Sequence, residues 1–118
     1  MASEKMQIMT TVGTRDGQKI LTLKGPLTIH TIFNFQTAVR EDSSAALIID
    51  FSGVPFMDSA GLGALVGARV ALQKANRSLA ITGLNTQVKA LLDMSKVNQF
   101  FRIFPTVEEA QAAAAAVA

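Results

Sequence analysis

Apolar and polar residues alternate loosely from Met6 to Val12 and again from Lys19 to Lys24. Alternation with a period of two is typical of a strand with one buried face, and the intervening Asp16-Gly17 is a strong hairpin signal. The two runs therefore predict two strands joined as a hairpin. Gly25-Pro26 ends the second strand, because proline has no N–H to donate to a sheet.

The rest of the chain alternates helix-like and strand-like segments. The nearly continuous apolar run Ala46–Phe51 favours a central, parallel strand. Thr106 and Glu109 form a capping box and predict that the last helix opens there. Apolar residues at helical spacing, and shorter apolar runs, predict helices over Ile29–Arg40, Gly61–Asn76 and Gln87–Met94, and strands over Leu79–Thr82 and within Phe100–Phe104.

This order predicts an α/β (α+β) fold: one domain with a mixed four- to five-stranded sheet and helices packed mainly on one side. The length of 118 residues fits that single domain over residues 1–118, with residues 1–5 and 112–118 expected to fray. We expect Met94 and the aromatic group Phe100, Phe101 and Phe104 to belong to the core.

Composition narrows the chemistry that is available. The chain has no cysteine and one histidine, His30, which excludes thiolate and multi-histidine metal sites. The formal net charge is +2, and the cations are scattered, so no direct nucleic-acid contact is expected. No stretch approaches the roughly 18 apolar residues of a membrane span, and no signal-peptide pattern opens the chain. We expect a cytoplasmic protein without membrane, metal or cofactor.

One stretch, Val54–Val70, stands apart. Asp58 and Ser59 follow the central strand where a helix must begin, and both residue types are good N-caps. Gly61 and Gly63 lie in the first turn, where glycine lowers helix propensity. Two interpretations stay open: the glycines permit close packing, or they leave bare amides that a phosphate or a partner approaches.

No enzyme motif is complete in this stretch. Gly61, Gly63 and Gly67 are spaced one residue too long for a dinucleotide fingerprint, and no Walker lysine follows. A hydrolase elbow needs glycine where Met57 stands, and His30 is the single histidine available to a triad. The chain is therefore not expected to be an enzyme.

Small residues also follow one side of the helix after Ser59, with two interpretations. They pack closely on the sheet, or they form a shallow contact surface for a partner with Arg69 near its rim. Asp50, at the end of the central strand, is expected to brace the following loop by accepting the amides of Ser52 or Gly53. The small residues are Ala60, Gly63, Ala64, Gly67, Ala68 and Ala71.

Three segments of the chain carry a resemblance to a known family. The most specific is I-I-D-F-S-G-V-P-F-M-D-S-A-G-L-G-A-L, from Ile48 to Leu65, supported by V-K-A-L-L-D-M-S from Val88 to Ser95 and by F-F-R-I-F-P-T-V-E-E-A from Phe100 to Ala110. In these segments the sequence resembles the STAS domains and, within them, the bacterial anti-sigma factor antagonists. The resemblance covers nearly the whole chain.

What the resemblance implies is a switch. Ser59 would be phosphorylated by a serine kinase that doubles as an anti-sigma factor, with Asp58 as its companion. The unphosphorylated antagonist would bind this kinase and free the sigma factor, and a PP2C-type phosphatase would reset it. The protein would be a monomer or a weak dimer. The expected partner-binding residues are Thr28, Asp58, Ser59, Ala60, Gly61, Leu62, Gly63, Gly67 and Arg69.

The sequence departs from the family at Thr28, which stands where the family commonly has an aspartate near the phosphorylated loop. Two other functions stay open. One is a scaffold subunit of a larger complex in which Ser59 is never modified. The other is a sensor that binds a small ligand or nucleotide through the amides of Gly61 and Gly63.

Overall fold

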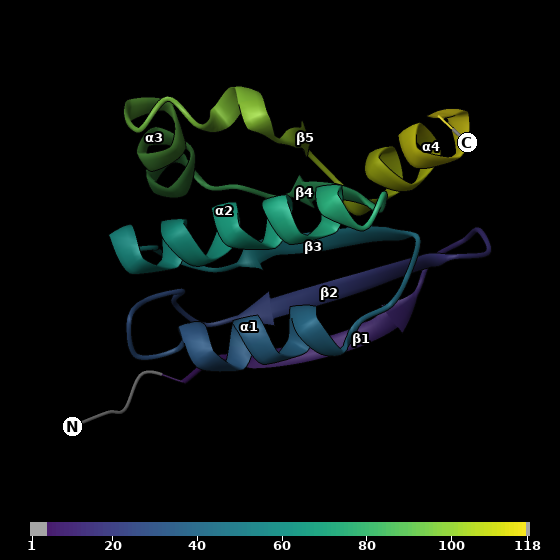
Figure 1. The fold of residues 1–118 in the computed structure, drawn as a ribbon. Coiled ribbons are helices and arrows are strands. Elements are labelled where there is room, and N and C mark those ends of the chain that lie inside the picture. The colour runs from purple at the N-terminus through teal and green to yellow at the C-terminus, as the bar shows by residue number, and fades with distance from the viewer. Residues whose placement is uncertain (1–4, 118) are drawn as a thin grey trace.

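The computed structural model describes residues 5–117 and contains one five-stranded sheet with strand order β1-β2-β3-β4-β5 (Figure 1). β1 runs antiparallel to β2, whereas β2, β3, β4 and β5 are mutually parallel. The predicted fold class is confirmed. The elements are β1 (Gln7–Val12), β2 (Gln18–Lys24), α1 (Ile32–Glu41), β3 (Ala46–Gly53), α2 (Ser59–Lys74), β4 (Ser78–Thr82), α3 (Thr86–Met94), the 3-10 turn η1 (Asn98–Phe100), β5 (Arg102–Phe104) and α4 (Val107–Val117).

The hairpin and the central strand form as the sequence predicts. Gly17 adopts a φ of +83°, which glycine reaches without strain, and Gly13 N–H donates to Gln18 C=O at 2.9 Å. β3 is the third of the five strands and is flanked by parallel neighbours on both sides. Because β2, β3 and β4 are parallel, the loops that follow them meet at the same end of the sheet.

The sheet separates two cores of unequal size. The larger one packs α1, α2 and α3 against one face and includes Phe35, Leu65 and Leu92 with Ile49 of β3. The smaller one lies on the other face, where Ala110 of α4 packs on Ile48 and Ala80. Alternate residues of β3 thus feed the two cores, and the prediction of helices mainly on one side is confirmed.

α1 begins later than predicted, at Ile32 rather than Ile29. The preceding residues form a hydrogen-bonded turn in which Thr31 Oγ1 accepts the Thr28 amide at 2.9 Å and donates to Pro26 C=O at 2.8 Å. Threonine side chains that bond nearby backbone groups compete with the helix. The chain between β2 and α1 is therefore a defined loop.

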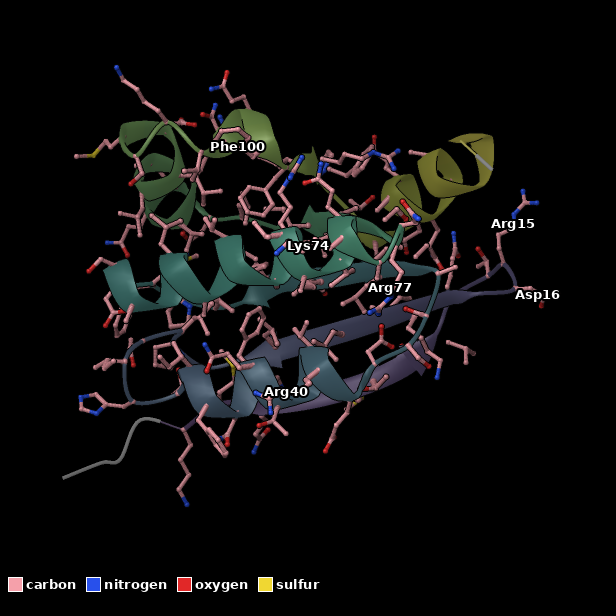
Figure 2. The ribbon with its side chains drawn as sticks, in the orientation of Figure 1. Arg15, Asp16, Arg40, Lys74, Arg77 and Phe100 are labelled. Carbon is pink, nitrogen blue, oxygen red and sulfur yellow. The ribbon has the colours of Figure 1, made fainter. Side chains whose placement is uncertain are left out.

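The predicted burial of Met94 and Phe100 is wrong. Met94 ends α3 with 80% of its surface exposed, and Phe100 is exposed on η1, whereas Phe101 and Phe104 are half-buried against the cores. The 3-10 turn η1 lies between α3 and β5, and Phe100, its last residue, points outward from it (Figure 2).

The C-terminal helix starts as the capping signal predicts. Glu109 N–H donates to Thr106 Oγ1 at 3.2 Å, and α4 continues to Val117. Residues 1–4 and 118, at the two ends where fraying is expected, lie outside the described residues.

Replacement of a single β3 side chain tests the larger core. Ile49→Ala should lower the free energy of unfolding by about 3 kcal/mol, because it removes a fully buried side chain and leaves a cavity. Urea denaturation measures the loss. Val70→Ala, at a partly exposed position of α2, is the control and should change stability by no more than about 0.5 kcal/mol. Equal effects of both variants would contradict the placement of the core.

Candidate functional site

Three loops gather at the carboxyl ends of the parallel strands, and Ser59 lies among them. The loop after β2 is joined to the loop after β3 by a bridge between Leu27 and Met57. Leu27 N–H donates to Phe56 C=O at 3.1 Å, and Asp58 N–H donates to Leu27 C=O at 3.2 Å. These bonds extend the pairing of β2 with β3 up to the start of α2.

The Asp58 carboxylate joins the same two loops through both of its oxygens. Oδ1 accepts the Gly61 amide at 2.8 Å, which caps α2. Oδ2 accepts the Ile29 amide at 3.0 Å, from the loop after β2. One side chain thus satisfies an unpaired amide of the helix end and fixes the position of the neighbouring loop.

These contacts set the protonation of Asp58. Desolvation alone would raise the pKa of its carboxyl, but the amides of Gly61, Ile29, Ala60 and Asp58 itself together hold the pKa below the ordinary value of 3.8. Hydrogen bonds that the charged form accepts favour that form. Asp58 therefore carries a full negative charge at neutral pH.

Ser59 is the first residue of α2, and its side chain is exposed. The hydroxyl lies at a helix N-terminus, where negative charge is favoured. However, the Asp58 carboxylate already accepts the Gly61 amide of this first turn. A negative group added to Ser59 would stand beside a fixed charge, and the Gly61 amide is not bare.

The glycines of α2 divide into two kinds. Gly61 is buried, and a Cβ there would lie 2.1 Å from the Leu27 carbonyl oxygen, so this position serves close packing and cannot face a partner. Gly63 and Gly67 are exposed, and a Cβ at either would meet nothing within 4 Å.

The small residues of α2 likewise face both ways. Ala64 and Ala68 are buried toward the sheet, whereas Gly63, Gly67 and Ala71 are exposed. Together they line a groove of about 500 Å³ between α1 and α2. Arg40 of α1 and Arg77, beyond the end of α2, line it as well (Figure 2).

Two of the expected contact residues lie apart from this surface. Thr28 is only 4% exposed, and its Oγ1 accepts the His30 amide at 3.2 Å, so it shapes the loop after β2 and cannot touch a partner directly. Arg69 is not on the rim of the groove. Its guanidinium donates to Phe100 C=O and lies 5.8 Å from the Phe100 ring centroid, on the η1 side of α2. Ala60 and Leu62 are half-buried beside Ser59.

Asp50 and Asn85 stabilise the loops around Ser59. Asp50 accepts the Ser52 amide at 3.0 Å and the Thr82 hydroxyl at 3.2 Å. Asn85 caps α3 by accepting the Val88 amide, and its Nδ2 donates to the carbonyls of Val54 and Pro55 at 3.2 and 2.9 Å. The sequence analysis missed Asn85. Its position two residues after Gly83 and just before a predicted helix is a recognisable N-cap signal.

Within residues 5–117, no group of three or more acidic, histidine or cysteine side chains is placed to hold a metal ion. Among the helices in the described part of the chain, none has the length and apolar character needed to cross a membrane.

Comparison with known proteins identifies the family. The family model of the STAS domain matches residues 9–110. The chain belongs to the STAS domain family. Similar proteins include the anti-sigma-B factor antagonist of Staphylococcus aureus (26% identical over 82 residues, covering 67% of this chain and 76% of that protein). The anti-sigma F factor antagonist of Paenibacillus polymyxa is 29% identical over 93 residues, covering 75% of this chain and 77% of that protein.

A solved structure agrees with this STAS assignment. The crystal structure of an anti-sigma factor antagonist from Mycobacterium paratuberculosis superimposes with a TM-score of 0.78 at 25% identity, covering 91% of this chain and 93% of that one. The fold and the family expected from the sequence are confirmed.

Replacing the two kinds of glycine in this STAS domain by alanine should change its stability in opposite directions. Gly61→Ala should destabilise the protein by at least about 2 kcal/mol, because the new methyl group overlaps the Leu27 carbonyl. Gly63→Ala, the matched control one half-turn away, should stabilise it by about 0.5–1 kcal/mol, because alanine favours helix and the space is open. Thermal and urea unfolding measure both. Similar effects at the two positions would contradict the packing of Gly61.

The Asp58 contacts predict that the stability lost on replacing Asp58 depends on pH. Asparagine caps a helix as well as aspartate does, so the expected cost of Asp58→Asn, about 1 kcal/mol at pH 7, comes from the hydrogen bond that is lost when the new NH₂ group faces the Ile29 amide. The folded-state pKa of Asp58 is lowered, so its stabilisation is present above the unfolded pKa and is lost as pH falls through the folded pKa.

Urea unfolding of both proteins between pH 7 and pH 2.5 therefore tests the role of the charge. The difference in the free energy of unfolding between wild type and Asp58→Asn should shrink as the pH falls. Asp93→Asn, at an exposed position of α3, is the control for simple loss of a carboxylate. A difference that stays constant with pH would show that the charge of Asp58 does not matter.

Proposed function

We propose that this STAS domain is an anti-sigma factor antagonist that is switched off by phosphorylation of Ser59. The observation that carries the proposal is the exposed Ser59 hydroxyl at the first residue of α2, next to the pinned and ionised Asp58. Its relatives in Staphylococcus aureus and Paenibacillus polymyxa are named anti-sigma factor antagonists, which supports the same role here.

In the unphosphorylated state, the partner is an anti-sigma factor that is also a serine kinase. It docks on the surface around Ser59, which includes the half-buried Ala60 and Leu62 and the exposed glycines Gly63 and Gly67. The missing side chains at these glycines let the partner backbone come close. Binding releases the sigma factor from the kinase. Thr28, Gly61 and Asp50 contribute by holding the loops.

Phosphorylation acts at the interface. A phosphoserine adds about −1.5 to −2 charges, here beside a carboxylate that already accepts the Gly61 amide of the first turn. The phosphate therefore projects a concentrated negative charge toward the docking face, and a surface that fitted a neutral hydroxyl is repelled. The fold need not change, because Asp58 and Asn85 hold the loops through bonds that do not involve the Ser59 side chain.

The transferred phosphoryl group comes from ATP bound, with Mg²⁺, in the kinase. This chain supplies the acceptor oxygen and needs no cofactor of its own. A PP2C-type phosphatase then hydrolyses the ester and restores the binding state, so the ratio of kinase to phosphatase activity sets the fraction of antagonist that can bind.

Intact-mass analysis tests the switch directly. The protein, Ser59→Ala and Ser95→Ala are each incubated with the host's anti-sigma kinases and Mg-ATP. Wild type and Ser95→Ala should each gain one phosphoryl group mapped to Ser59, and Ser59→Ala none. Ser95 is an exposed serine at the end of α3, which makes it the matched control. The phosphorylated form should bind the kinase at least about tenfold more weakly than the unmodified form, a penalty of about 1.4 kcal/mol.

Other outcomes would contradict the proposal in distinct ways. Stable binding to a partner that ATP does not affect, with no modification of Ser59, would indicate a scaffold subunit. Nucleotide binding by the isolated domain that survives Ser59→Ala would indicate a ligand sensor. The Gly61 amide such a sensor would use is already bonded to Asp58, and this favours the switch.

A further inference from the structure

β1 is a free edge of the sheet. Within residues 5–117 it pairs with β2 and with no other strand (Figure 1). In an antiparallel pair of strands, hydrogen-bonded and non-hydrogen-bonded residue pairs alternate. Gly13 N–H donates to Gln18 C=O, so every second pair counted from Gly13 and Gln18 is a hydrogen-bonded one. Gln7, Met9 and Thr11 therefore bond to β2, whereas Ile8, Thr10 and Val12 direct their N–H and C=O groups outward.

The two edges of the sheet differ in how they are protected. β5 is three residues long, contains Arg102 and is followed by Pro105. Short length, charge and proline are the devices by which proteins prevent pairing at an edge. β1 has six residues, QIMTTV, with no charge and no proline. Its hydrogen-bonding edge is thus open and suited to accept another strand.

Exposed apolar side chains lie beside this edge, within a groove whose other lining residues are largely polar. Val12 is 73% exposed, and Phe33, which projects from α1 next to β1, is 70% exposed. β1 and α1 together line a groove of about 850 Å³ that includes Ile8, Val12 and Phe33. An added strand would find main-chain partners along the edge and apolar side chains on the helix-covered face.

We propose that the β1 edge binds the β1 edge of a second copy of this chain, antiparallel, about a two-fold axis at Thr10. A two-fold axis perpendicular to the sheet places the helix-covered faces of both copies on the same side of the joined sheet. Side chains that pair must therefore lie on the same face, so an even-numbered residue of β1 pairs with an even-numbered one. Centring on Thr10 places Thr10 opposite Thr10 and Ile8 opposite Val12, all on the helix-covered face, and all of them are residues with outward N–H and C=O groups.

This register favours a second copy over an unrelated strand. Thr–Thr and Ile–Val are favourable cross-strand pairs, and an uncharged strand meets its own copy without repulsion. A two-fold interface uses the same patch twice, which suits a strand that is complementary to itself. Phe33 of each copy lies close to the shared edge, where it loses exposure. Ser59 is separated from this edge by β2 and α1 and stays accessible (Figure 1).

A charge at the two-fold axis tests the interface. Thr10→Lys places two lysines opposite each other and should raise the dissociation constant of the dimer at least about tenfold, because like charges directly opposite destabilise a pair. Thr11→Lys is the matched control: it adds the same charge on the other face of the strand, opposite Met9 of the second copy. It should change the dissociation constant of the dimer little. Light scattering coupled to size exclusion, from about 1 μM to about 1 mM, covers the affinities of weak dimers.

Single cysteines test the register itself, because the natural chain has none. Directly opposite residues of a bonded pair have Cα atoms about 5.5 Å apart, within reach of a disulfide. Thr10→Cys should therefore oxidise to a covalent dimer. Two copies of Thr11 lie diagonally, beyond the reach of about 7 Å, so Thr11→Cys should remain monomeric on a non-reducing gel.

Contrary results would overturn the proposal. A wild-type protein that stays monomeric up to about 1 mM has no such interface. A dimer that Thr10→Lys does not weaken, or cross-linking of Thr11→Cys as fast as Thr10→Cys, places the contact elsewhere. Melting curves of the lysine variants show that they fold, so a monomeric Thr10→Lys reports on association alone.

Discussion

The two bonds of the Asp58 carboxylate join the start of α2 to the loop after β2. Through Gly61 it caps the N-terminus of α2, and through Ile29 it adds a side-chain bond to a loop that is also paired at Leu27. The close approach that these bonds require explains why position 61 has no side chain: the Leu27 carbonyl occupies the space. The loop, the cap and the glycine therefore depend on one another, and each position constrains the residue allowed at the others.

The same carboxylate gives a reason why a phosphate on Ser59, as proposed, would change binding more than folding. A helix N-terminus with free amides would draw a phosphate in and neutralise part of its charge. Here Asp58 already accepts the Gly61 amide, and its lowered pKa keeps it ionised. A phosphate on Ser59 would remain in solvent, at the surface, next to a second negative group. The fold would supply the support, and the change in charge would be presented to the proposed partner.

The sequence predicts features whose cause is local. The Asp16-Gly17 hairpin, the apolar strand Ala46–Phe51 and the Thr106 cap follow from nearby residues, and the structure has all three. Features set by distant contacts escape such prediction. Nothing near Gly61 along the chain reveals the Leu27 carbonyl, and nothing near Phe100 reveals that η1 turns it outward.

The candidate site shows the same division. Asp58 and Ser59 are recognisable at a helix start, because N-caps have a local signature. The burial of Thr28 results from a turn closed by Thr31, and the contact of Arg69 with Phe100 joins segments 31 residues apart. Asn85 has a local N-cap signal, but no local pattern predicts its hydrogen bonds to Val54 and Pro55. The family motif locates the candidate site at Asp58 and Ser59, whereas the contacts that support it depend on the packed fold.

The parallel topology also separates the two surfaces that this domain offers. Loops that follow parallel strands collect at one end of the sheet, so the Ser59 region is built from the ends of β2, β3 and β4. The free main-chain groups of β1 face sideways instead, at the edge of the sheet. An antiparallel partner there would extend the sheet laterally and leave its carboxyl end uncovered. The proposed contact between copies and the proposed binding of a regulatory partner at Ser59 would therefore not block each other.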